Sequence, residues 1–160
     1  MPFVYSITSS TPAVVYTTHS TINTEDPVIV IRQAVRGVDL NGIYVNGRGD
    51  ALTAITGLTF YVRRWTTAGS GGTACTPAPR RIGTTASTTA ADKLTTITAG
   101  TVTSGFQVVF GCGAAGPGGW VARDADSAIH LEGTSADELD IDSVCGGSAF
   151  KFTMSAEIAE

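Results

Sequence analysis

Histidine is scarce in this sequence, which limits the acid–base chemistry that the chain can perform. Only His19 and His130 occur among the 160 residues, whereas a serine or cysteine nucleophile needs a neighbouring base, most often histidine. His130 alternates with Ile129 and Leu131, so we expect its side chain to point away from the core. The G-x-S-x-G, P-loop and H-E-x-x-H motifs are also missing. We therefore predict that the protein is not an enzyme.

Two pairs of aspartates could support metal chemistry. Asp124 and Asp126, and likewise Asp140 and Asp142, are two residues apart, which places both carboxylates of a pair on one face of a strand. Such oxygens could bind Ca²⁺, but the EF-hand loop pattern is missing and exposed strand faces commonly carry acids. We predict solvated strand faces, with no metal and no cofactor.

Arginine and aromatic residues mark a candidate interaction face in the segment LTFYVRRW, residues 58–65. Its apolar residues alternate with Tyr61, Arg63 and Trp65, so one face of the strand should enter the core while these three side chains occupy the other. Aromatic residues and arginine are enriched at protein interfaces. We predict that this face docks on another protein; a solvated edge with a stacked arginine is the alternative.

The glycine-rich segment that follows is either a binding loop or a bend. Glycines in residues 69–72 should reverse the chain at one end of a sheet. Pro77 and Pro79 should then keep the exiting segment extended and outside a central ladder. We interpret this segment as architecture, with a role as contact surface as the alternative. The run GCGAAGPGG, residues 111–119, should be a surface loop.

Composition favours an all-β protein that does not bind nucleic acid. Hydrophobic residues make up 42% of the chain and charged residues 15%, and β-branched residues recur throughout. The net charge of -4, without any block of lysine and arginine, argues against nucleic acid as a partner. Neither a secretory signal nor a membrane-spanning stretch is recognisable, so we expect no membrane partner and no membrane export. The three cysteines, Cys75, Cys112 and Cys145, should be small packing residues.

Short alternating segments separated by glycine indicate the fold. About eight such strands predict a two-sheet antiparallel β-sandwich, jelly-roll-like, with an immunoglobulin-like sandwich as the alternative. Residues 148–160 should form a long central strand. We predict a sandwich domain over residues 28–160 and an extended N-terminal arm over residues 1–27, with a strand of the main sheet or a frayed end as the alternatives for the arm. The arm would contribute Phe3, Tyr5 and Tyr16 to an interface, and the domain should fold without it.

The segment FYVRRWTTAGSGGTACTPAPR, together with the closing strand FKFTMSAEIAE, resembles a family of tailed-bacteriophage virion proteins. The similarity covers roughly residues 55–160. It implies a head decoration, or cement, protein with a β-sandwich fold that bridges major capsid protein subunits and forms a homotrimer. Such a protein would be synthesised in the host cytoplasm and located on the capsid surface of the virion. It implies no catalytic residues.

Two other functions remain open. A receptor-binding or carbohydrate-binding module of a phage tail could use an aromatic platform, for which the candidates are Tyr44, Tyr61, Trp65 and Trp120. A coat protein of a small virus generally needs a basic arm to neutralise its genome, and residues 1–27 contain neither lysine nor arginine. The decoration protein is the preferred interpretation.

Overall fold

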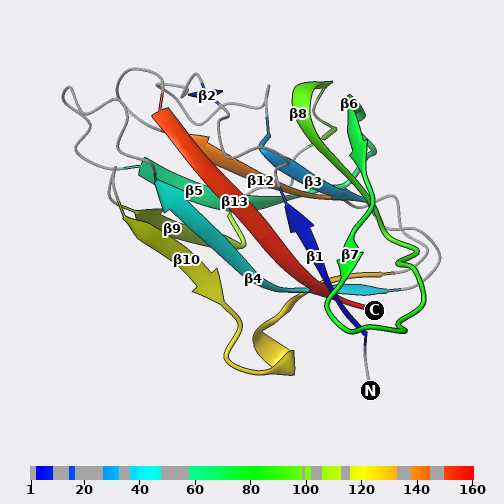
Figure 1. The fold of residues 1–160 in the computed structure, drawn as a ribbon. Helices are drawn as coiled ribbons and strands as arrows, with labels where there is room; N and C mark the ends of the chain where they lie inside the picture. Colours follow the sequence, from blue (N-terminus) through cyan, green and yellow to red (C-terminus); the bar gives the residue numbers. More distant parts are fainter. Residues whose placement is uncertain are drawn as a thin grey trace.

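The structure is a computed structural model that describes residues 3–8, 15–16, 27–32, 37–47, 58–98, 100–101, 106–112, 116–132, 138–144 and 150–160. Two antiparallel sheets pack face to face with an apolar core between them (Figure 1). Most successive strands change from one sheet to the other, which is the winding of a jelly roll. The predicted all-β, two-sheet antiparallel sandwich is confirmed.

The first sheet is built around the long strand that the alternating C-terminal residues predict. From edge to edge its strands are β10 (Pro117–Val121), β4 (Val38–Gly47), β13 (Phe150–Ala159), β1 (Val4–Thr8) and β7 (Ala78–Pro79). Two short strands extend it, because β11 (Ile129–Leu131) pairs with β4 and β2 (Val15–Tyr16) pairs with β13. Strand β13 is therefore central and long, as predicted.

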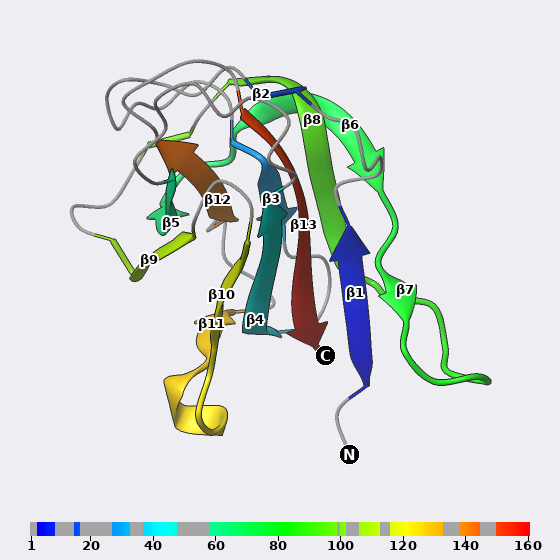
Figure 2. The same ribbon diagram turned by 60° about the vertical axis from the view of Figure 1, so that its left-hand side comes forward.

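The second sheet has six strands in the described part of the chain. From edge to edge they are β6 (Ser70–Cys75), β8 (Ala90–Thr98), β3 (Ile29–Arg32), β12 (Glu138–Val144), β5 (Leu58–Trp65) and β9 (Val108–Cys112). Figure 2 shows the strands of the first sheet side by side, with β10 and β7 at its opposite edges. A short 3-10 helix, η1 (Ala125–Ser127), connects β10 to β11.

The core forms where the apolar residues of both sheets face each other. The first sheet contributes Leu40, Ile43, Val45, Phe152, Met154, Ala156 and Ile158, and the second contributes Ile29, Ile31, Phe60, Val62, Leu139 and Ile141. Phe60 packs edge-on against Phe152 across the sandwich, with ring centroids 5.1 Å apart. Of the cysteines predicted to be packing residues, Cys112 is buried in this core and Cys75 packs against it, both as free thiols; Cys145 lies outside the described residues.

The predicted N-terminal arm is, in its first part, a strand of the main sheet. Strand β1 pairs with β13 from Val4 to Thr8, and Tyr5 and Ile7 are buried in the core. Apolar residues at alternate positions explain this, because one face of the strand closes the core. Deletion of residues 1–27 would therefore remove a core strand, contrary to the expectation that the domain folds without them. Residues 1–2, 9–14 and 17–26 lie outside the described residues.

The glycine-rich segment after β5 bends the chain earlier than the sequence suggests. The bend occupies residues 66–69, and Ser70–Cys75 is strand β6, with a bulge between Gly71 and Thr73. Glu138 holds the bend by accepting a hydrogen bond from the Gly69 amide at 3.0 Å. The chain then crosses to the edge of the first sheet as β7. The prediction that the prolines keep this segment outside a central ladder is correct.

The predicted surface loop over residues 111–119 is wrong at both ends. Strand β9 continues to Cys112, and strand β10 begins at Pro117. The glycines allow close approach between strands, since a Cβ on Gly119 would lie 2.4 Å from the Ile43 carbonyl oxygen, and one on Gly118 would lie 2.3 Å from the Cβ of Cys112. Glycine in this segment therefore marks tight strand packing.

Candidate functional site

Arg63 and the aspartates Asp140 and Asp142 lie together on the outer face of the second sheet. In the register of β5 and β12, Arg63 lies opposite Asp140 and Tyr61 lies opposite Asp142. We call these four residues the Arg63 cluster. All four are at most 3% exposed. The shared face of Asp140 and Asp142 is thus as predicted, but it is buried rather than solvated.

Arg63 is bound mainly to Asp140. Its Nε donates to Asp140 Oδ1 at 3.2 Å, its backbone amide donates to the same oxygen at 3.1 Å, and Nη2 donates to Oδ2. Asp142 is further from the guanidinium, at 3.7 Å from Nη2, and accepts a hydrogen bond of 2.7 Å from the Tyr61 hydroxyl. The guanidinium carbon also lies 5.0 Å from the centroid of the Tyr61 ring. The pairing is bidentate and specific to arginine.

The Arg63 cluster contains two carboxylates for one guanidinium, and burial acts on both. Burial raises the pKa of Asp142 to about 6, although the hydrogen bond from Tyr61 opposes this shift. Burial also raises the pKa of Asp140, against the opposing effect of Arg63. Burial raises the pKa of the Tyr61 hydroxyl, with the nearby Asp142 charge adding to the effect. Within the described part of the chain, Asp142 is therefore the carboxylate without a full counter-charge.

The predicted docking face over Tyr61, Arg63 and Trp65 is not on the surface. Tyr61 and Arg63 belong to the buried cluster, and Trp65 is fully buried in a small apolar cluster with Val30 and Ile97. Alternation correctly separated the two faces of β5, but both faces are covered. These three side chains stabilise the sheet and do not present a contact surface in this structure.

The residues of the arm that were predicted to form an interface differ in exposure. Tyr5 is 1% exposed and packs in the core, whereas Phe3 is 41% exposed at the start of β1. Tyr16 lies in β2, where its backbone pairs with Phe150; the structure does not describe its side chain. Of the aromatic candidates for a sugar platform, Trp120 is half-buried against the core and only Tyr44 is exposed on an outer sheet face.

The other predicted chemical residues have structural contacts. Asp124 is not on a strand but caps η1, where its carboxylate accepts from the Ser127 amide at 2.9 Å. His130 points away from the core as predicted, and its Nδ1 lies 2.6 Å from Asp39 Oδ1. Among the residues that the structure describes, no group of three or more histidine, cysteine or acidic side chains is placed to hold a metal ion. The described residues also include no helix long and apolar enough to cross a membrane.

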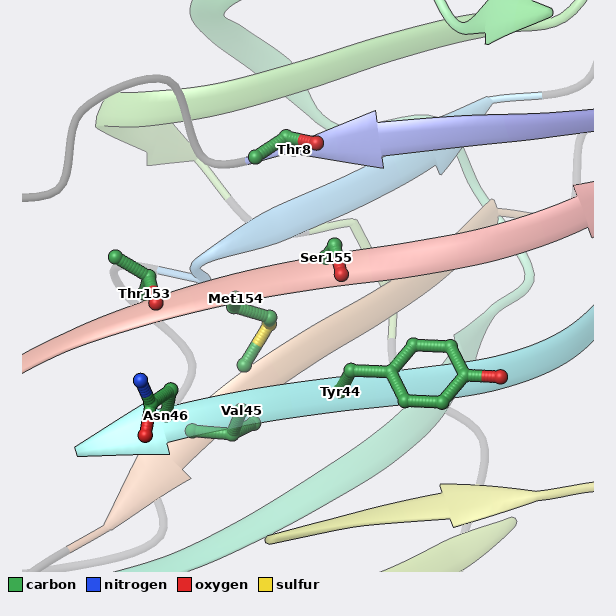
Figure 3. A pocket seen from close by; sticks show the side chains of 7 residues that line it. All are labelled: Thr8, Tyr44, Val45, Asn46, Thr153, Met154 and Ser155. Carbon is green, nitrogen blue, oxygen red and sulfur yellow. The ribbon is translucent and has the colours of Figure 1, made fainter. Parts of the chain in front are cut away.

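A shallow hollow of about 170 Å³ lies on the outer face of the first sheet beside Tyr44 (Figure 3). The Tyr44 ring lies over Gly42, since a Cβ at position 42 would be 3.1–3.3 Å from ring and hydroxyl atoms. Tyr44 is 44% exposed. Hydroxyl and amide side chains surround the hollow, namely Thr8, Asn46, Thr153 and Ser155. An aromatic face with neutral hydrogen-bonding groups suits a sugar ring.

Comparisons with known proteins identify no family for this chain. No protein-family model matches the chain, and no curated protein matches it. A solved structure of the infectious bursal disease virus VP2 subviral particle aligns with a TM-score of 0.24 and 14% identity, over 99% of this chain and 41% of that one. The chain spans less than half of that structure, and such a TM-score is not evidence of common function. The resemblance to bacteriophage decoration proteins thus remains a prediction.

Proposed function

We propose that this chain is a structural protein of a virus particle, and specifically a decoration protein that bridges major capsid protein subunits on the head of a tailed bacteriophage. The sequence resemblance motivates the family, and a rigid sandwich suits a protein that holds other proteins together. Bridging requires several weak contacts made at once, whose effects multiply. It also requires contact surfaces that are ordered before binding.

One observation supports this proposal most directly. Phe106 and Val109, at the β9 edge of the second sheet, are 44% and 57% exposed. Phe106 packs edge-on against Tyr61 with ring centroids 5.3 Å apart, and Val109 lies opposite Tyr61 in the register of β5 and β9. We call these two residues the β9 patch. Tyr61 is fixed by its hydrogen bond to Asp142, so the β9 patch is an exposed apolar contact on a rigid base.

The test uses capsids of the encoding virus that lack this chain. The purified protein should bind them saturably in co-sedimentation, and the double variant Phe106→Ser with Val109→Ser should bind at least about tenfold more weakly. Tyr44→Ser is the matched control, because Tyr44 has the same exposure as Phe106 but lies on the other sheet. Absence of binding by the unmodified chain would refute the proposal.

A second function, carbohydrate binding, is favoured by the Tyr44 hollow. Stacking of a sugar on the exposed ring, with hydrogen bonds from Asn46 and Ser155, would use the geometry of that hollow. A glycan array screened with the unmodified protein and with Tyr44→Ala tests this function. Binding that is abolished by Tyr44→Ala supports it, and an array without any Tyr44-dependent signal excludes it.

A further inference from the structure

The connection between β7 and β8 ends in a turn that places an apolar side chain in water. Ile82 is fully exposed. It lies in a turn closed by a hydrogen bond of 3.4 Å from the Thr84 amide to the Arg81 carbonyl. Gly83 has a φ of 80°, which a residue with a side chain rarely adopts. We call Arg81 and Ile82 the tip. Figure 2 shows the green connection beyond β7 extending away from both sheets.

The segment before the tip is fixed to the first sheet. Strand β7 pairs with β1 at Ala78 and Pro79. The Arg80 amide then donates to the Val4 carbonyl at 3.0 Å. The Arg80 side chain forms an ion pair with Glu157 on β13. The chain therefore enters the tip in a defined direction.

The segment after the tip is fixed as well. The Tyr5 hydroxyl donates to the Thr85 carbonyl at 3.0 Å. The Glu160 carboxylate then accepts from the amides of Thr88 and Thr89, at 3.1 and 2.8 Å, and from nearby hydroxyls. Single exposed apolar residues are common, but this one is held on a loop anchored at both ends. A partner would not have to order this loop on binding.

A hollow complementary to the tip lies over β10, β4 and β13 of the same sheet. Its volume is about 320 Å³, and it is lined by Asp39, Asn41, Val121, Ala122, Asp124, Ala125, Glu157 and Ala159. We call it the acidic hollow. Val121 is 55% exposed there, so the hollow combines an apolar surface with carboxylates. Glu157 already pairs with Arg80 of the same chain, so Asp39 and Asp124 supply the negative charge that this pair does not neutralise. An isoleucine beside a guanidinium matches both features.

We propose that the tip of one copy of this chain inserts into the acidic hollow of a second copy. Ile82 would contact Val121 and the adjoining alanines, and Arg81 would lie beside Asp39 and Asp124. Because the tip follows β7 and the hollow adjoins β10, at opposite edges of the first sheet, the contact is head-to-tail. Such contacts form closed rings when the rotation between copies closes. This inference rests on the proposed function, whose family resemblance implies a homotrimer.

The contact is an anchor and not a complete interface. A stable interface buries about 1,600 Å² in total, which one side chain and its neighbours cannot supply. We therefore expect concentration-dependent association that weakens with added salt, since Arg81 acts through charge. Analytical ultracentrifugation across a range of protein and salt concentrations measures both properties. A chain that stays monomeric at every concentration would refute the inference.

Two variants that each disable one half of the contact provide the sharpest test. Ile82→Asp disables the tip and Val121→Asp disables the hollow, and each variant alone should associate at least about tenfold more weakly than the unmodified chain. Mixed together they should form a 1:1 dimer and nothing larger, because only one tip and one hollow remain functional. Both positions are exposed, so unchanged thermal unfolding should show that the variants fold. Equal association of Ile82→Asp and the unmodified chain would refute the inference.

Charge variants with matched controls separate the electrostatic part. Asp124→Asn keeps a residue suited to the cap of η1 but removes a charge from the hollow, and it should weaken association. Asp126→Asn removes an exposed acid of the same helix that does not line the hollow, so it should leave association unchanged. Equal effects of the two would contradict the contact. Capsid binding by monomeric Ile82→Asp is measured separately, so failure of the decoration role and failure of this contact give different results.

Discussion

The outer faces of the two sheets carry arginine–carboxylate pairs in opposite environments. On the second sheet, the side chains of Arg63 and Asp140 are 4% and 0% exposed. On the first sheet, the side chains of Arg80 and Glu157 are 50% and 21% exposed. The first pair joins the neighbouring strands β5 and β12. The second joins the residue after β7 to strand β13. Only the buried pair has lost its hydration. Removal of one partner should therefore lower the free energy of unfolding strongly at the buried pair and only slightly at the exposed pair.

The difference teaches that polarity on a strand face does not indicate exposure. The same two-residue alternation places Arg63 and Tyr61 on the outer face of β5 and Tyr44 on the outer face of β4. One face is covered and the other is open to solvent. Contact surfaces therefore have to be sought on the first sheet, at its margins and at the β9 edge. The charged face of β5 is a structural element.

Loss of the buried arginine should have the largest effect on stability. Arg63→Met leaves two carboxylates buried without a cation, which should lower the free energy of unfolding by about 4 kcal/mol. Chemical denaturation at pH 7 measures this loss. A loss below about 1 kcal/mol, the size expected for an exposed pair, would show that the Arg63 cluster is hydrated in solution.

The excess carboxylate of the Arg63 cluster should make stability depend on pH. The pKa of Asp142 is about 6 in the folded chain against the usual 3.8, so the folded state binds more protons between these values. Stability should fall as pH rises from about 4 to 6, by up to about 3 kcal/mol, and stay level above.

Asp142→Asn isolates this contribution, because the amide cannot ionise and can still hydrogen-bond to Tyr61. Denaturation of both proteins between pH 4 and 7 gives the difference. The advantage of the variant over the unmodified chain should grow as pH rises. A constant difference across this range would mean that Asp142 ionises normally.

The sequence predicted the architecture well because alternation reports directly on strands. The sandwich, the central position of β13, the edge placement of Pro79 and the outward direction of His130 all follow from local patterns. The β1 strand was left open against an extended arm. The alternation of Tyr5 and Ile7 indicated a strand, but the many Ser and Thr residues around them made the segment look too polar for a core strand.

The candidate sites were not predictable in the same way because their residues are distant in sequence. Arg63 and Asp140 are 77 positions apart, so nothing local shows that one neutralises the other. Opposite charges on the polar faces of two strands were the only signal. The acidic hollow likewise joins β4, β10 and β13, and the tip is recognisable only when the anchoring of both flanks is known. Strand pairing, which the sequence leaves undetermined, creates these sites.

A smaller effect of opposite pH dependence is expected at the margin of the first sheet. Although burial acts against it, hydrogen bonds from Ser87, Thr88 and Thr89 lower the pKa of Glu160 below its usual 4.5. This carboxylate therefore stabilises the fold above about pH 4.5, and the contribution is lost as pH falls through the folded pKa. Glu160→Gln should cost about 1 kcal/mol at pH 7 and speed hydrogen exchange at the Thr88 and Thr89 amides. Unchanged exchange there would show that the carboxylate does not hold this segment.

The exposed pair should have the smallest effect and the strongest dependence on salt. Arg80→Met removes a guanidinium that is half in water, so the free energy of unfolding should fall by less than about 1 kcal/mol. In 1 M salt, where the screening length is about 3 Å, even this loss should disappear, whereas the cost of Arg63→Met should remain because its partners are buried. Denaturation of both variants in low and high salt measures the contrast. Equal salt dependence would mean that the two outer faces share one environment, and the distinction between a structural face and a contact face would fail.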